Sequence, residues 1–179
     1  MRLAREKPMP PRRAAAALLL CLAAPALAEV ELAPTCLPGL PGLASLSKFT
    51  GKCTRALHLG QDRTAECAGT VTGVGYVGGR SGFSFELAGG LQVVLTGGDG
   101  QADGPVLKFK VDTLSTGKGA GMTKVQVRGA CVLDATDTSA ARISCAIPAE
   151  GRDSRYEFVA SGKPEHWKVC PPDAKKPAP

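Results

Sequence analysis

Asparagine is absent from this chain of 179 residues, and histidine occurs only twice, as His58 and His166. The absence of asparagine excludes an N-glycosylation acceptor and the S-D-N element of serine-acylating enzymes. Isoleucine is almost as rare, with Ile143 and Ile147 only, whereas alanine, glycine, arginine and proline are plentiful. Because codons for Asn and Ile are rich in A and T, this bias indicates a bacterial genome rich in G and C.

No apolar run reaches the roughly 20 residues that a membrane-spanning helix needs. The longest, residues 14–28, follows a basic segment and ends in the small-x-small sequence Ala26-Leu27-Ala28. This order predicts a signal peptide over residues 1–28 and a mature chain that begins at Glu29. Cys21 leaves a lipoprotein as the alternative, although Leu20 precedes it where a lipoprotein signal has a small residue. We therefore expect a periplasmic or secreted protein with no membrane span in its mature chain.

Long runs of like charge are also missing. The formal net charge of +6 falls to +2 once the expected signal peptide is removed, which leaves 17 basic and 15 acidic residues. These charges are interspersed and do not form the basic stripe of a nucleic-acid-binding protein. We expect no nucleic-acid partner, and the pattern does not indicate an oligomeric state.

Six cysteines remain after cleavage, and an even number in an exported chain predicts disulfides. Two stretches share one pattern, Gly-x-Cys, thirteen residues and Cys-Ala. This spacing predicts two stapled hairpins, Cys53 to Cys67 and Cys131 to Cys145. Elimination then predicts Cys36 to Cys170, which is one of the 15 connectivities that six cysteines allow.

The same spacing predicts a strand register for each hairpin. Facing Cys53 with Cys67 puts His58 opposite Asp62, with a loop over residues 59–61. Facing Cys131 with Cys145 puts Asp134 opposite Arg142, a pair of opposite charges across the strands. The shared pattern also suggests a duplicated hairpin unit, with coincidence as the alternative because glycine and alanine are so common here.

The remaining chain reads as short strands between glycine-rich segments. Residues 83–87 and 91–95 alternate apolar and polar around Gly89-Gly90, which predicts a hairpin with a two-residue turn. Residues 106–112, 123–128 and 155–159 alternate in the same way, bounded by glycines at 97–104 and 117–121. With 22 glycines and no amphipathic helical window, we expect an all-β fold, a single small antiparallel sandwich or barrel of about 8–9 strands.

Proline and glycine set the expected domain limits. Residues 29–47 contain three prolines and predict an irregular arm pinned by Cys36. Residues 48–170 hold the β-domain, and residues 171–179 form a proline-rich tail without an apolar pattern, which is typical of disorder.

Motifs that could carry chemistry are incomplete. Residues 73–78 match G-x-G-x-x-G, but residues 79–82 (GRSG) cannot start the helix that a phosphate-binding turn needs, so a glycine-rich strand bend is the better interpretation. The S-x-x-K sequences at residues 45–48 and 115–118 lack the companion elements of serine-acylating enzymes. There is no C-x-x-C, and His166-x-x-x-Cys170 cannot bind metal through an oxidised cysteine. We predict no catalytic residue, cofactor site or metal site, and interpret His58 as a solvated turn residue.

Residues 81–85 (SGFSF) resemble the S-G-x-x-Y loop of periplasmic lysozyme inhibitors, which are small disulfide-bearing β-barrels. Phe85 stands where that motif has tyrosine, and the family's second motif around a tryptophan is missing. The resemblance implies a small disulfide-bearing β-barrel.

Three classes of function follow from these observations. The first is an exported, non-catalytic β-domain that binds a protein or cell-envelope partner. The second is a lipocalin-like carrier of a small apolar ligand, if the barrel is hollow. The third is a small hydrolase, which has the least support because no nucleophile motif is assembled.

Overall fold

The computed structural model describes Leu37 and residues 42–170. The expected signal peptide over residues 1–28, Cys21, Cys36 and the expected tail over residues 171–179 lie outside the described residues. Among the described residues, no helix is long and apolar enough to cross a membrane.

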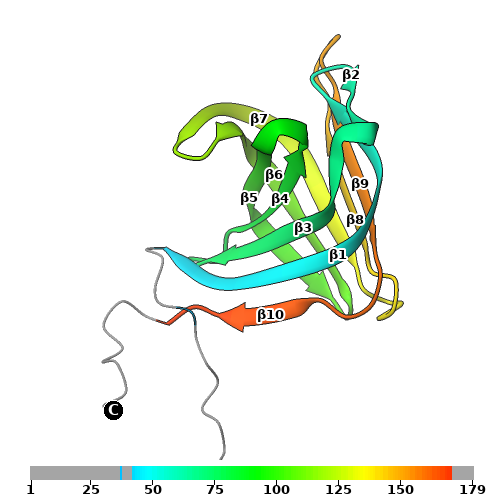
Figure 1. The fold of residues 1–179 in the computed structure, drawn as a ribbon. Coiled ribbons are helices and arrows are strands. Elements are labelled where there is room, and N and C mark those ends of the chain that lie inside the picture. Colours follow the sequence, from blue (N-terminus) through cyan, green and yellow to red (C-terminus); the bar gives the residue numbers. More distant parts are fainter. Residues whose placement is uncertain (1–36, 38–41, 171–179) are drawn as a thin grey trace, which may run out of the picture. The chain divides into compact units, whose positions relative to one another are not determined.

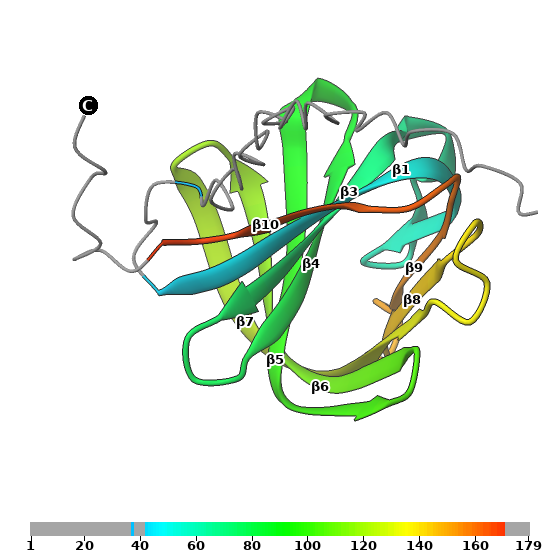
Figure 2. The ribbon, with the colours of Figure 1, turned by 90° about the horizontal axis from the view of Figure 1, so that it is seen from below.

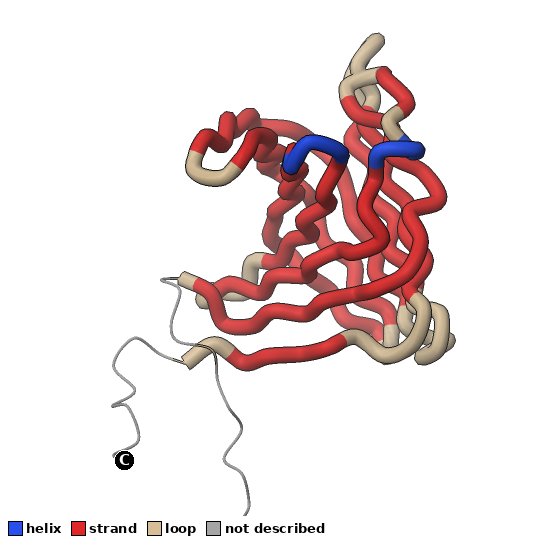
Figure 3. The backbone as a smooth tube through the Cα atoms, viewed as in Figure 1, coloured by secondary structure: helices blue, strands red, loops and turns tan. Residues whose placement is uncertain are grey.

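Strands make up almost all of the described fold, with two short 3-10 turns between them (Figure 3). The strands are β1 (Leu43–His58), β2 (Gln61–Asp62), β3 (Cys67–Tyr76), β4 (Ser81–Leu87), β5 (Leu91–Asp103), β6 (Val106–Lys118), β7 (Gly121–Asp134), β8 (Arg142–Ile147), β9 (Ser154–Ala160) and β10 (Glu165–Lys168). The turns are η1 (Thr64–Glu66) and η2 (Ala88–Gly90). The all-β prediction is therefore confirmed.

The sheet closes on itself as an antiparallel barrel. Its order is β1-β3-β4-β5-β6-β7-β8-β9, and β9 returns to pair with β1 (Figure 1). The long strand β1 makes this closure possible because its first half pairs with β3 and its second half with β9. Strand β10 continues beside the first half of β1, where β9 has ended (Figure 2).

Side chains fill the inside of the barrel. Alternate residues of each strand point inward, as in β9, where Tyr156 and Phe158 are completely buried. Aromatic rings from four strands meet there, with Phe83 against Phe49 and Phe109, and Phe85 stacked on Tyr156 at 4.9 Å. These rings and the aliphatic side chains around them form one buried hydrophobic cluster, so the described interior of the barrel is a packed core.

The first strand begins earlier in the chain than the sequence predicts. Strand β1 starts at Leu43, within residues 29–47, for which we expect an irregular arm. Leu37 forms a short parallel bridge with Val169, and the backbone N–H of Cys170 donates to the carbonyl of Leu37. Cys170 is oxidised in a disulfide, and the Cys36 half of the predicted pair lies outside the described residues.

The second disulfide has the predicted geometry. Cys131 and Cys145 are direct partners on β7 and β8, and Asp134 faces Arg142 in the same register. Both sulfurs belong to the buried core. The spacing was sufficient here because the two strands are consecutive and run without a bulge between the cysteines.

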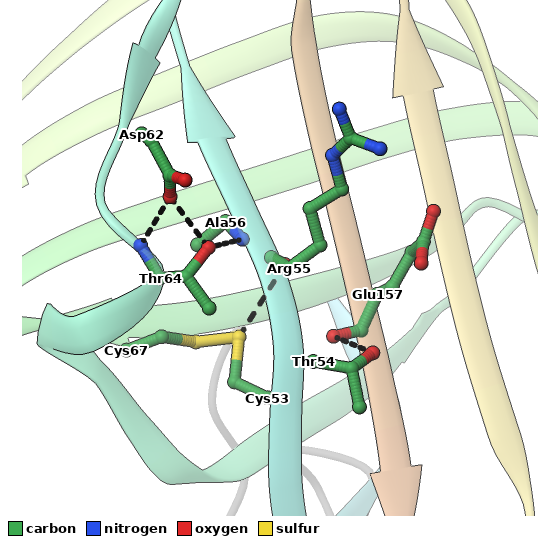
Figure 4. Close-up of a disulfide and its surroundings, with 8 residues drawn as sticks. All are labelled: Cys53, Thr54, Arg55, Ala56, Asp62, Thr64, Cys67 and Glu157. Atoms are coloured by element: carbon green, nitrogen blue, oxygen red, sulfur yellow. Dashed lines mark hydrogen bonds between the residues drawn. A yellow bond between two sulfur atoms is a disulfide. The ribbon is translucent and has the colours of Figure 1, made fainter.

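The first disulfide joins Cys53 to Cys67, but the predicted register around it is wrong (Figure 4). Leu57, not His58, faces Asp62, and the loop is the two-residue turn Leu59-Gly60, both with positive φ. Asp62 then accepts hydrogen bonds from the backbone N–H and the hydroxyl of Thr64. The staple therefore ties β1 to the start of β3 across a 3-10 turn, so the two Gly-x-Cys units do not form matching hairpins.

The two Gly-x-Cys glycines nevertheless share one role. A Cβ atom on Gly51 would lie 2.1 Å from the carbonyl oxygen of Val159, and one on Gly129 would lie 2.5 Å from that of Ala146. No Cβ atom can occupy such positions without a backbone shift. Glycine two residues before the cysteine thus allows β1 to approach β9, and β7 to approach β8, at two corners of the barrel.

The other glycine-rich segments do not end the strands where expected. Strand β5 continues through residues 97–100 to Asp103 with bulges, and β6 continues to Lys118. The β4–β5 hairpin exists, but its loop has three residues, 88–90, with positive φ at Gly89 and Gly90. Glycine in these strands marks bulges rather than loops.

Candidate functional site

His58 lies inside one end of the barrel, so its interpretation as a solvated turn residue is wrong. It is 8% exposed, and its Nδ1 lies 2.6 Å from the hydroxyl of Tyr156. Ser154, also buried, accepts a hydrogen bond from the backbone N–H of Leu59. No sequence pattern indicates this cluster, because β9, which supplies Tyr156 and Ser154, begins almost a hundred residues after His58.

Burial controls the ionisation of this cluster. Burial, and secondarily the charge of Arg63, lowers the pKa of His58, so the imidazole is neutral at pH 7. Burial also raises the pKa of the Tyr156 phenol well above its usual range. One hydrogen bond joins the neutral imidazole to the neutral phenol, so each of these buried groups has a polar partner. The cluster is enclosed and holds β1 to β9.

The opposite mouth of the barrel holds a small pocket of about 130 Å³. Phe49, Phe83, Leu107 and Leu133 supply most of its apolar lining, with Ser45, Ser47 and Ser81 at the rim. At this end the Ser47 hydroxyl lies 2.8 Å from Nδ1 of His166, across the β1–β10 pair.

The sequence motifs do not come together as catalytic sites. Ser45 and Lys48 are three positions apart on a strand and therefore point to opposite faces. Residues 73–78 lie at the end of β3 and in the turn that follows, with β4 and not a helix after them. Residues 81–85 lie within β4, and Phe85 is buried in the core rather than presented on a loop. Among the described residues, no three His, Cys, Asp or Glu side chains gather as a metal site.

A larger opening than the mouth pocket lies on the outer wall of the barrel. It is a groove of about 430 Å³ whose floor is the outward face of β5 and β6, formed by Val94, Thr96, Thr113 and Ser115. The outward residues of β7, Met122, Lys124 and Gln126, form one side. Tyr76 and Arg80, from the turn between β3 and β4, form the other.

A bidentate ion pair builds one side of this groove. The guanidinium of Arg80 donates to both carboxylate oxygens of Asp112, at 2.8 and 2.6 Å. Asp112 is directed outward at a bulge of β6, where the register shifts between Val111 and Thr113. The hydrogen bonds from Arg80 hold the pKa of Asp112 below its usual range. The pair links the residue before β4 to β6 across the intervening strand β5.

The groove offers a mixed set of recognition groups. Burial raises the pKa of Tyr76, so its phenol stays protonated at neutral pH and can donate a hydrogen bond. The hydroxyls of Thr96 and Ser115 and the amide of Gln126 can donate or accept, whereas the Thr113 hydroxyl already donates to Asp112. Val94 and Met122 add apolar surface. Arg80 is neutralised by Asp112, which leaves Lys124 as the cation of the groove with no ion pair to a described residue.

Sequence reasoning missed this groove because its parts come from four separate segments. The alternation of apolar and polar residues in β5 and β7 is visible in the sequence, but the bulge that turns Asp112 outward is not.

The disulfides agree with an oxidising compartment. No family model, curated protein or solved structure matches this chain.

Proposed function

We propose that this chain is an exported, non-catalytic binding domain that holds a protein or other cell-envelope partner on the outer wall of its barrel. The expected signal peptide and the paired cysteines support export to the periplasm. The observation that carries the proposal is the contrast between the packed interior and the open, polar groove outside.

A carrier of an apolar ligand has less support. Ligand pockets of small molecules are typically about 300–1,000 Å³. The pocket at the barrel mouth measures about 130 Å³, and the rings of Phe49 and Phe83, which line it, pack against each other. The outer groove, at about 430 Å³, falls within the usual range and is lined by both polar and apolar groups.

Site-specific photo-crosslinking in the exporting bacterium tests this proposal. Tyr76 is replaced by p-benzoylphenylalanine, which keeps an aromatic side chain in the groove wall, and the same residue is placed at exposed Arg152 in the β8–β9 connection as the matched control. We expect a discrete crosslinked product from position 76 only. The proposal fails if position 76 yields no product, or if both positions yield the same one.

A further inference from the structure

Strand β7 has an unpaired edge. On one side it pairs with β6 along its length, but on the other side β8 pairs only with Ala130 to Asp134. Residues 121–128 therefore have no strand beside them among the described residues. The turn of the β6–β7 hairpin lies well away from β8 and β9 (Figure 1).

This edge is exposed on both faces. Thr123, Lys124, Val125 and Gln126 are all exposed, and the side chain of Val125 is 47% accessible. Along an antiparallel strand, every second residue directs its N–H and C=O away from its neighbour. About four residues of this segment thus present unpaired backbone donors and acceptors, which is the arrangement that an added strand recognises.

We propose that an extended, acidic segment of a partner protein adds to this edge as an additional antiparallel strand. The proposal rests on the binding function proposed above and states how the partner is held. Lys124 and Arg128 are both exposed and lie four residues apart along this edge, and neither forms an ion pair with a described residue. A strand with acidic residues four positions apart would place one opposite each cation, and apolar residues between them would meet Val125 and Val127.

The charges also argue against a second copy of this chain as the occupant. In an antiparallel pair of two β7 edges, the register that brings Val125 opposite Val127 brings Lys124 opposite Arg128. Like charges directly opposite each other destabilise a strand pair. Basic residues on an exposed edge are a known protection against self-association, and here the same two cations favour an acidic strand.

The groove extends the same surface. Lys124 and Gln126 line the groove with their side chains, while the backbone of the same residues forms the edge. A partner that pairs with β7 would therefore pass beside the groove and could place its next residues against Tyr76. Backbone hydrogen bonds at the edge would supply affinity for the partner strand, and side-chain contacts in the groove would supply specificity for its sequence.

Three capped, fluorescent heptapeptides test the proposal with the full exported chain. The first is Ser-Glu-Val-Thr-Val-Glu-Ser, the second has lysine in place of both glutamates, and the third keeps the first sequence but is N-methylated at its three central amides. We expect the first to bind at least about tenfold more tightly than the second, because two attractive cross-strand pairs become repulsive. We expect the third not to bind, and the amides of residues 121–128 to exchange more slowly when the first is bound.

Charge-reversal variants locate the site. The double variant K124E and R128E changes two exposed side chains and should reverse the preference between the first two peptides. The matched control, K52E and K163E, alters two exposed cations elsewhere and should not. Equal binding of the N-methylated peptide, equal binding by poly-glutamate, or a dimer that the peptide dissociates would each overturn strand addition by a protein partner.

The two proposals fail in different ways. If crosslinking from position 76 succeeds while the peptides and the K124E and R128E variant have no effect, the groove binds a partner but the edge does not. If the peptides bind as expected while position 76 yields no product, the edge binds a strand but the proposed function of the groove is wrong.

Discussion

The hydroxyl of Tyr156 on β9 lies 2.6 Å from Nδ1 of His58 at the end of β1, inside the barrel. This hydrogen bond joins the two strands that close the sheet, and both of its partners are neutral. Loss of Tyr156 leaves Nδ1 of His58 buried without this hydrogen bond, whereas after loss of His58 the phenol keeps its hydrogen bond with Ser154.

Tyr156→Phe should lower the free energy of unfolding by about 1–3 kcal/mol, because it leaves a buried imidazole nitrogen unpaired. His58→Leu should also destabilise, and the double variant should cost less than the sum of the two. Urea unfolding of the wild type, the two single variants and the double variant gives the coupling free energy between the two side chains, which we expect to be about 1 kcal/mol or more. Additive effects would contradict a direct bond between the two side chains.

Stability should depend on pH through His58. Its pKa is lowered in the folded state, so the unfolded chain binds the proton more readily, with a pKa near 6.5. Stability is therefore full above about pH 6.5 and falls as the pH drops toward 5, whereas carboxylates with lowered pKa, such as Asp112, lose their contribution only below about pH 4. Urea midpoints between pH 5 and 7.5 should show this slope in the wild type and lose it in His58→Gln. The exposed His166→Gln is the matched control and should keep the slope.

The Cys53–Cys67 and Cys131–Cys145 disulfides should contribute differently to the free energy of unfolding. Each closes a loop of 14 residues, which corresponds to about 3 kcal/mol from loop closure in the unfolded chain. Cys131 and Cys145 are both fully buried, whereas Cys67 is only half-buried. Replacing Cys131 and Cys145 by alanine should therefore cost more than replacing Cys53 and Cys67, because it also opens a cavity in the core. Equal losses on thermal unfolding would contradict this order.

Gly51→Ala should destabilise the barrel by about 1–3 kcal/mol, because the new methyl group would collide with the carbonyl of Val159. Gly98→Ala is the control: it adds the same group to a strand where nothing lies within 4 Å of the added Cβ. Its effect should stay within about 0.5 kcal/mol. The comparison of melting temperatures separates steric collision from the general effect of alanine in a strand.

Leu59→Asn should raise the melting temperature. Leu59 has a φ of 50°, which is unfavourable for a leucine, and asparagine tolerates this conformation better. The expected gain is about 0.5–1 kcal/mol, because the left-handed conformation costs asparagine less and the leucine, at 47% exposed, loses little packing. A lower melting temperature would mean that its apolar contacts outweigh the strain.

The sequence predicted what depends on neighbours along the chain. Alternation identified the strands, and the Cys131–Cys145 register followed because β7 and β8 are consecutive and straight. It misplaced the register around Cys53 because the turn uses a leucine at positive φ, which turn preferences do not anticipate. It could not place His58 or Asp112, since one depends on closure by a distant strand and the other on a bulge.

Strand β1 pairs with both β3 and β9, and this double pairing affects the order of folding. Its second half pairs with β9, and Gly51 meets Ala160 across 109 positions of the chain. Until β9 is made and docked, half of β1 has no partner on that side, so the seam must form late. Contacts between such distant segments slow folding and leave strand edges open to other chains in the meantime. A chain shortened before β9 should therefore aggregate rather than form a smaller barrel.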